Sequence, residues 1–190
     1  DGVIDYDGMS EATGSKDLWT EAEFGNYKLH VEWRFKDTPG LYDMPTIKPD
    51  GTYETDEQGN VITTPTPNAD SGIFIRGPEH QVNIWCWPVG SGEVYGYRMD
   101  ESMPASVRKG VTPMTNADNH IGEWNTFRIQ VIGNRLTVDL NGKRVLDDAE
   151  LPGLPEEGPI ALQHHGNKVN GAWQSPPSLV QFRNIYIKEL

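Results

Sequence analysis

The stretch Asp70–Arg98, DSGIFIRGPEHQVNIWCWPVGSGEVYGYR, contains two segments in which apolar and polar residues alternate strictly. In residues 71–77, Ile73 and Ile75 fall on one face, whereas Phe74 and Arg76 fall on the other. In residues 81–87, Val82 begins a similar alternation, with an apolar or thiol side chain at every second position. A period of two is typical of half-buried antiparallel strands. The sequence therefore predicts two such strands here.

The second face of these strands carries planar polar groups and indoles instead of the usual Lys, Glu and Thr. A sugar ring can stack its C–H face on an aromatic side chain, while amides and a guanidinium bond its hydroxyls. The alternative is an ordinary exposed sheet face or a second layer of core. We predict a carbohydrate-binding surface that includes Arg76, Gln81, Asn83, Trp85 and Trp87.

The composition narrows the classes of protein and of partner. A chain of 190 residues is long enough for one domain with a two-layer core, and 20 Gly and 14 Pro suit a turn-rich β protein. A net charge of −12 argues against binding to nucleic acid or anionic membranes. No apolar run approaches the ~20 residues of a transmembrane segment. The single cysteine, Cys86, excludes an internal disulfide, and its place on the apolar side of a strand predicts a buried, inert thiol.

The remaining strands are predicted from the same alternation. Gly133–Asn134 and Asn141–Gly142 are turn dipeptides that join three of them into a meander. Residues 37–70 form a long loop or hairpin insertion, with a small hairpin at 52–63, and residues 99–121 form a second polar connection. The sequence predicts an all-β sandwich of antiparallel sheets, a single domain over 1–190. The further expected strands are 3–6, 18–20, 27–35, 124–132, 135–140, 143–146, 160–165 and 179–190.

Seven motifs occur in a characteristic order along the chain. They are SGIFIR (71–76), QVNIW (81–85), GEVYGY (92–97), GEWNTFRIQV (122–131), LNGKRV (140–145), GPIALQHHG (158–166) and VQFRNIYIKEL (180–190). Together they resemble the DUF1080 family of 3-keto-disaccharide hydrolases over nearly the whole chain. The FRNI-x-IKEL ending and G-P-I-x-LQ-x-HG are the most specific part of this resemblance.

The resemblance implies a concanavalin A-like jelly roll whose concave sheet holds a ligand groove. It also implies a secreted or periplasmic bacterial protein that acts on oxidised sugars. Two positions depart from the family pattern, because Gln81 stands where a Glu is usual and His164 where an Asp is common. The family usually carries a further strand and a Trp-rich segment before the DGVI of this chain, so the resemblance implies a start inside the domain.

The chemistry of a two-carboxylate glycosidase does not fit the central strand. Retaining glycanases of this fold usually present E-x-D-x-x-E on one strand, whereas Gln81 and Asn83 can neither attack nor transfer a proton. A 3-keto sugar changes the requirement, because its carbonyl acidifies the hydrogen on C2 and the glycosidic bond can then leave by elimination. Water addition would follow. This route needs a base near C2, a group that polarises the carbonyl, and an acid at the leaving oxygen.

The IALQHH segment supplies the histidine candidates. If its apolar residues are core, Gln163 and His165 share the face that points at the groove. His165 then serves as base or metal ligand, and the alternative is a histidine bonded into the turn at Gly166. Because strand ends twist, His164 and His165 can exchange these roles.

Charged and aromatic residues complete the expected site. Arg76 and Arg183 are the expected cations for an enolate oxygen, with an ion pair within the sandwich as the alternative for Arg183. Glu93 is the nearest carboxylate, or else a rim charge. The predicted catalytic residues are His165, Glu93 and Arg183, and the predicted substrate-binding residues are Arg76, Gln81, Asn83, Trp85, Trp87, Tyr95, Tyr97 and Gln163, where one of the two tyrosines is alternatively core.

A divalent metal is an open expectation. His165, His80 and His120 could converge with carboxylates, but no ligand spacing supports a site, and the abundant oxygen ligands favour Ca²⁺ or Mn²⁺ over zinc. No other cofactor is expected. Three functions remain open: cleavage of 3-keto-disaccharides or related modified sugars, non-catalytic carbohydrate binding in the same groove, and a laminin-G-like protein interaction through the loop 37–70.

Overall fold

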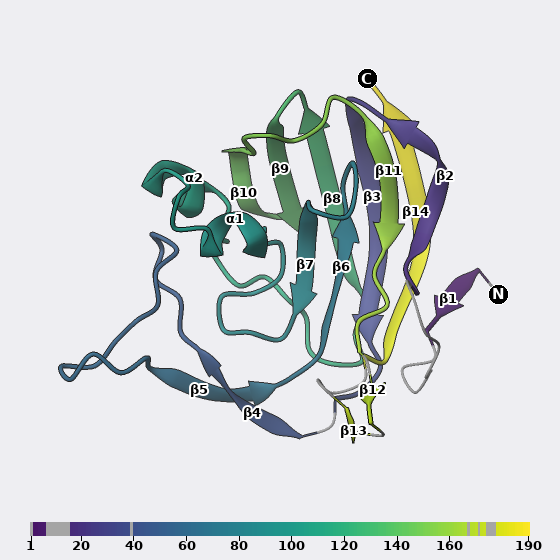
Figure 1. Cartoon of the computed structure of the whole chain (residues 1–190). Helices are drawn as coiled ribbons and strands as arrows, with labels where there is room; N and C mark the ends of the chain where they lie inside the picture. The colour runs from purple at the N-terminus through teal and green to yellow at the C-terminus, as the bar shows by residue number, and fades with distance from the viewer. Residues whose placement is uncertain (1, 7–15, 39, 167, 171, 174–177) are drawn as a thin grey trace.

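The structure is a computed structural model that describes residues 2–6, 16–38, 40–166, 168–170, 172–173 and 178–190. Two antiparallel sheets lie face to face (Figure 1), which confirms the predicted sandwich. The six-stranded sheet comprises, in order, β1 (Val3–Asp5), β14 (Val180–Glu189), β3 (Tyr27–Phe35), β8 (Asn125–Ile132), β9 (Arg135–Leu140) and β10 (Lys143–Glu150). The four-stranded sheet comprises β2 (Leu18–Phe24), β11 (Gly158–Leu162), β6 (Asp70–Phe74) and β7 (Gln81–Trp85).

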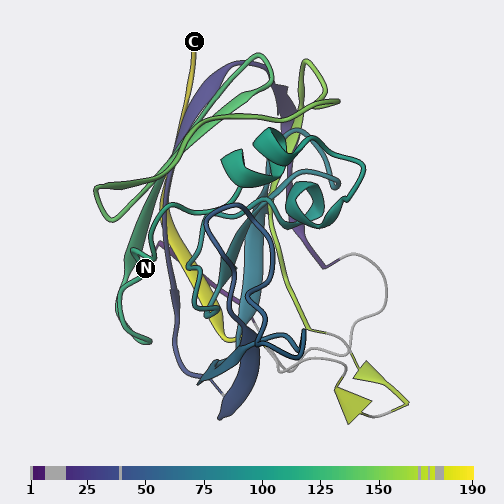
Figure 2. The same cartoon turned by 90° about the vertical axis from the view of Figure 1, so that its left-hand side faces the viewer.

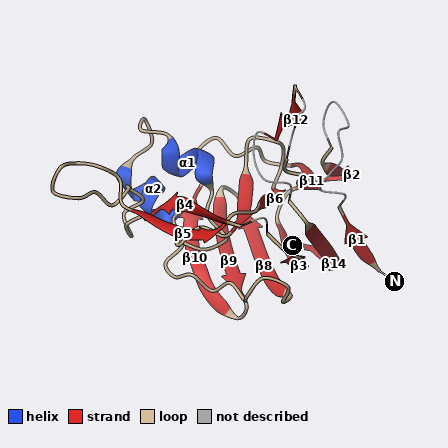
Figure 3. Ribbon diagram, turned by 90° about the horizontal axis from the view of Figure 1, so that it is seen from below, coloured by secondary structure: helices blue, strands red, loops and turns tan. Residues whose placement is uncertain are grey.

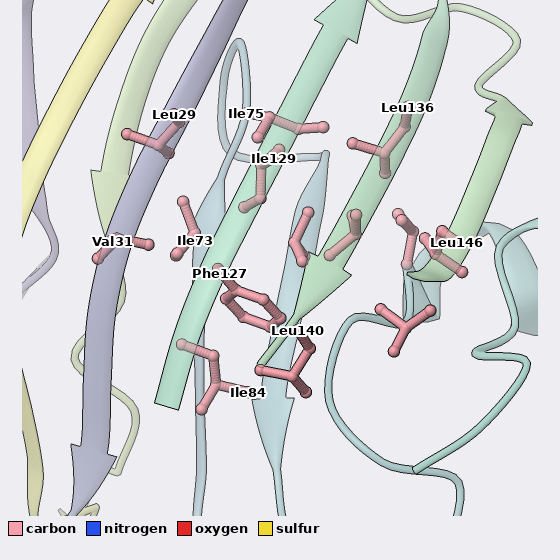
Figure 4. Packing of buried hydrophobic residues seen from close by; sticks show 14 of the residues in the cluster. Leu29, Val31, Ile73, Ile75, Ile84, Phe127, Ile129, Leu136, Leu140 and Leu146 are labelled. Atoms are coloured by element: carbon pink, nitrogen blue, oxygen red, sulfur yellow. The ribbon is translucent and has the colours of Figure 1, made fainter. Parts of the chain in front are cut away.

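The core fills the space between the two sheets. Alternate residues of β3 are buried, as the period-two pattern predicted, and β8 and β9 follow the same rule. Ile73 and Ile84 extend into this space from the four-stranded sheet, and Phe127 and Leu140 meet them from the six-stranded sheet (Figure 4). Burying these side chains removes apolar area from water at about 25 cal/mol per Å², which is the main stabilisation of such a fold.

The meander of β8, β9 and β10 is confirmed, together with its tight turns. Asn141 and Gly142 have positive φ angles of 52° and 80°, as the type I′ turn of a two-residue hairpin requires. Because this turn matches the twist of the flanking strands, it fixes the register in which Lys143 pairs with Leu140.

The long segment 37–70 contains more regular structure than the sequence predicted. β4 (Leu41–Pro45) pairs with β5 (Thr63–Pro67) in a separate two-stranded sheet, which Figure 3 shows from below. The expected hairpin is present, since Thr55 and Val61 form a bridge around the turn. β5 reads TTPTP and lacks apolar alternation, so its pairing was not predictable from the pattern. A last pair consists of β12 (Lys168–Val169) and β13 (Ala172–Trp173).

Two short helices, α1 (Tyr95–Met99) and α2 (Ala105–Gly110), follow β7 on the side of the sandwich shown in Figure 2. The sequence predicted both Tyr95 and Tyr97 at the ligand surface, or else one of them in the core, and the structure places Tyr97 in the core. In a helix, residues two apart point in nearly opposite directions, so Tyr95 is 39% exposed and Tyr97 only 5%. Within the described part of the chain, no helix is long and apolar enough to cross a membrane.

Candidate functional site

The outer face of the four-stranded sheet gathers several of the predicted residues. Strand pairing sets Asp70 opposite Trp85, and Gly72 opposite Asn83. The backbone N–H of Gln163, just beyond β11, donates to the Gly72 carbonyl at 2.9 Å, which adds the third strand to the same row. We call this surface the amide surface. It consists of Asp70, Gly72, Gln81, Asn83, Gln163 and His165.

Three amide side chains of this surface have unsatisfied polar atoms. Gln81 Nε2, Asn83 Oδ1 and Gln163 Oε1 are buried and lack a hydrogen-bond partner among the described residues. Leaving a buried polar atom without a partner costs about 1–3 kcal/mol, so such groups are normally paired. These three polar atoms converge around Gly72. A site that forms hydrogen bonds with the hydroxyls of a ligand is expected to have such an arrangement.

Gly72 provides the space between the amides. A Cβ at this position would overlap the side chain of Gln81, whose Cγ would lie only 2.6 Å away. Because the end of a long side chain can move aside, we expect Gly72→Ala to leave the unfolding midpoint within a few degrees of wild type. The displaced amide should weaken ligand binding about tenfold, a loss of ~1.4 kcal/mol. Calorimetric titration measures this, and an unchanged affinity would show that Gln81 does not contact the ligand.

Asp70 and His165 form the ionisable part of the amide surface. Asp70 Oδ2 lies 3.8 Å from His165 Nε2, and about a third of each side chain is exposed (33% and 32%). Burial raises the pKa of Asp70 to about 6, and the attraction of His165 opposes this only in part. The hydroxyl of Ser178 accepts from the Asp70 N–H at 3.3 Å and donates to its carbonyl, which fixes the strand end. A carboxylate poised near neutrality is suited to proton transfer.

The two adjacent histidines point in different directions. The ring of His164 lies 5.2 Å from the ring of Tyr6, and its backbone N–H donates to Asp17 Oδ1 at 3.0 Å. His165 instead approaches Asp70. The sequence left the roles of the two histidines interchangeable. The structure places His165, and not His164, at the amide surface.

Aromatic side chains border the amide surface at both ends. Trp87 stacks on Trp85 with a centroid distance of 4.2 Å and an angle of 3°, and Tyr95 meets both edge-on. Trp85 is 3% exposed and donates from Nε1 to the Gly90 carbonyl at 2.7 Å, so it supports Trp87 rather than facing a ligand. At the other end Trp19 stacks on Phe74 at 5.3 Å, a pair that the sequence analysis missed.

Arg76 has a structural position instead of a place at the site. It is 2% exposed, and its guanidinium donates to the carbonyls of Gly25, Gly133 and Pro155. Its backbone φ of 54° is in the left-handed region, where the outward alternation of β6 has ended. The expectation that Arg76 faces the ligand is therefore corrected: it ties three loops together at the far end of the sandwich.

Arg183 lies on the other sheet. Its Nε donates to Glu32 Oε2 at 2.6 Å, and its guanidinium lies 3.9 Å from the centre of the Trp124 ring. Arg183 faces outward while its neighbour Phe182 is buried, as strand alternation requires, but alternation does not tell which sheet a strand joins. The expectation that Arg183 contacts a ligand oxygen at the amide surface is therefore wrong. Its alternative, an ion pair within the sandwich, is what the structure shows.

Glu93 is fully buried and forms an ion pair with Arg98, so it is neither a rim charge nor a group on the amide surface. The Glu93 carbonyl accepts from the Asn83 N–H at 2.9 Å, which couples this loop to the amide surface. Tyr97 is buried as well, and its hydroxyl lies 3.0 Å from Nδ1 of His80. Neither of these two predicted side chains therefore lies on the amide surface.

The expected convergence of His80 and His120 with His165 is absent from the part of the chain that the structure describes. No group of three His, Cys, Asp or Glu side chains is placed there to hold a metal ion. Cys86 is half-buried, and burial raises the pKa of its thiol to about 12, which agrees with the inert thiol that was predicted.

Asp70 is the candidate site residue that sequence reasoning missed. It precedes the alternating run SGIFIR, so it looked like the end of a loop. One signal could have found it, because Asp70 has the same parity as Gly72 and Phe74 and therefore faces outward with them.

Comparisons with known proteins agree with this architecture. A candidate glycosyl hydrolase from Parabacteroides distasonis aligns with all of this chain and 72% of its own, at 20% identity and a TM-score of 0.57. A second from the same organism covers 100% of this chain and 88% of its own, at 20% identity and a TM-score of 0.53. At these identities the likeness shows the fold. No curated protein matches the chain. Residues 1–188 match the 3-keto-alpha-glucoside-1,2-lyase-like domain, and the chain belongs to this family.

Proposed function

We propose that this protein cleaves glycosides that carry a 3-keto group, by eliminating the glycosidic bond at the amide surface. The observation that carries the proposal is the placement of Asp70, a carboxyl with a pKa of about 6, next to His165 and beside three amides with unsatisfied polar atoms. Family membership supports the same class of substrate.

Asp70 is assigned as the base. With a pKa of about 6, roughly 90% of this carboxyl is ionised at pH 7, yet it is basic enough to accept a proton. It removes the hydrogen on C2, which the neighbouring carbonyl acidifies, and the C–H electron pair moves into the enolate. Gln81 Nε2, which is buried and lacks a partner, is the donor assigned to the enolate oxygen.

His165 is assigned as the acid that assists the leaving group. The enolate re-forms the carbonyl as a double bond forms between C1 and C2, and the C1–O bond breaks with its electrons on the leaving oxygen. A proton from His165 neutralises that oxygen, so the step is balanced without any redox change. Asn83 and Gln163 are assigned to the hydroxyls of the sugar.

Non-catalytic carbohydrate binding is the second candidate function. It is favoured by one observation: among the described residues of the amide surface, Asp70 is the single carboxylate. Amides bordered by Trp87 and Tyr95 are sufficient to bind a sugar without transforming it. We also propose that His165 could be a ligand of a divalent metal, and the comparison with and without EDTA described below tests this.

The deciding experiment measures turnover of a 3-keto-disaccharide and of its unoxidised parent, with and without EDTA. We expect cleavage of the keto sugar alone, at a rate that falls about 100-fold or more in His165→Gln, because removing a general acid costs on this order. Asp148→Asn, an exposed acid on β10, is the matched control and should keep full activity. Binding of the keto sugar without turnover would reject the enzyme and leave a carbohydrate-binding module.

A further inference from the structure

The outer face of the six-stranded sheet carries a cluster of basic side chains on the opposite side of the sandwich from the amide surface. Strand pairing places Lys28 of β3 directly opposite Lys188 of β14. On the neighbouring row, His30 is opposite Arg128 of β8. This concentration of positive charge belongs to a chain whose net charge is −12. We call these four side chains together with Tyr186 the basic face.

Three cations of the basic face have no acidic partner among the described residues, whereas His30 Nε2 lies 3.8 Å from Glu32 Oε1. Within the described chain, the side chains of Lys28, Arg128 and Lys188 take part in no ion pair or hydrogen bond. The nearby acids are already engaged, since Asp139, which lines the depression in register with Arg128, accepts from Arg144 at 2.5 Å, and Glu32 accepts from Arg183. Like charges directly opposite in a sheet destabilise it, so the Lys28–Lys188 pair has a cost that a bound anion would remove.

The same face has the shape and the polar groups of a ligand site. A depression of about 440 Å³ crosses five strands there and is lined by Lys28, His30, Arg128, Gln130, Thr137 and Lys188, among others. Tyr186 borders it, 63% exposed, with its ring 5.8 Å from the ring of His30. An exposed ring suits the C–H face of a sugar, and an amide and a hydroxyl suit sugar hydroxyls.

We propose that the basic face binds an acidic oligosaccharide. The carboxylates of this ligand pair with Lys28, Lys188 and Arg128, and one of its sugar rings stacks on Tyr186. The row from β14 to β10 spans four strand spacings, about 19 Å, which fits a short oligomer. Nucleic acid is disfavoured, because the net charge of −12 repels a long polyanion approaching the rest of the molecule. The proposal does not depend on catalysis at the amide surface, since the two surfaces lie on different sheets.

The test is calorimetric titration of the whole chain with tetragalacturonate and with its fully methyl-esterified form at low salt. We expect binding of the acid alone, weakening as salt is added, and at least a tenfold loss of affinity in the double variant Lys28→Gln/Lys188→Gln. Lys48→Gln/Lys109→Gln changes the net charge equally at exposed positions elsewhere and should bind like wild type. Tyr186→Ser should weaken binding at least threefold.

Three results would overturn the proposal. One is equal affinity for the acid and its methyl ester, which would show that charge is not recognised. Another is the same loss of affinity in both double variants, which would reduce the effect to net charge. The third is tighter binding of a single-stranded DNA 12-mer that is lost in Lys28→Gln/Lys188→Gln, which would make the ligand a nucleic acid. Asp70→Asn should leave tetragalacturonate binding unchanged, so the outcome is independent of the proposed cleavage activity.

Discussion

Asp70→Asn is expected to abolish cleavage of a 3-keto-disaccharide while making the folded protein more stable at neutral pH. An amide cannot accept the proton of C2, so the rate should fall by about 10²–10⁴-fold, the usual contribution of a general base. For the wild type, activity should rise with pH through the Asp70 pKa of about 6, because the carboxylate is the active form. A pH–rate profile and turnover by the variant measure both effects.

The stability gain follows from the sign of the pKa shift. Burial raises the pKa of Asp70 from 3.8 to about 6, so between these values the folded state binds more protons than the unfolded state. Stability from this group is complete below pH 4 and is lost as pH rises through 6. Because a third of the side chain is exposed, we discount the effect to about 1–2 kcal/mol.

The variant should therefore melt a few degrees higher than the wild type at pH 7, and at the same temperature at pH 3.5, where both side chains are neutral. Asp148→Asn, on the exposed edge of β10, is the control for loss of one negative charge. Full activity in the variant would show that Asp70 is not the base. Lower stability of the variant at pH 7 would show that Asp70 is not a desolvated carboxylate.

Arg98→Ala is expected to destabilise the fold by about 3–5 kcal/mol, because it leaves the carboxylate of Glu93 buried without a partner. Glu93 is 0% exposed and Arg98 2%. Arg98 also donates to the Gly51 carbonyl at 3.3 Å and lies over the ring of Tyr53 at 5.2 Å, so its loss loosens the segment 37–70 as well. Urea unfolding at pH 7, followed by fluorescence, measures the change.

A double variant separates the lost pair from the lost volume. Glu93→Gln/Arg98→Met removes both charges while keeping similar bulk, and replacing both members of a buried pair is far less costly than removing one. We expect it to recover at least half of the stability that Arg98→Ala loses. If the double variant is as unstable as the single one, packing around Arg98 and not the buried charge explains the loss.

Because the Glu93 backbone is bonded to that of Asn83, the Arg98→Ala variant should also bind substrate more weakly where it remains folded.

Much of the fold was predictable because it depends on local alternation. The pattern of β3 marked Leu29, Val31, Trp33 and Phe35 as one face, and all four are buried. The Asn141–Gly142 dipeptide marked a type I′ turn that the φ angles confirm. The sequence also placed Gln81, Asn83, Gln163 and His165 on outward faces, where the structure finds them. Parity along a strand follows from the pleat of the backbone, so a sequence reader can derive it without tertiary information.

The tertiary structure alone decided which outward faces meet. Arg183 and Gln163 both point outward, yet one strand joins the six-stranded sheet and the other the four-stranded sheet, so the two side chains lie on opposite sides of the sandwich. Arg76 turned inward because its strand ends before it, and Trp85 became covered because Trp87 folds back on it. The pairing of Asp70 with His165 joins residues 95 positions apart, and such a contact depends on the order of strands in the sheet, which long-range packing sets and local alternation does not encode.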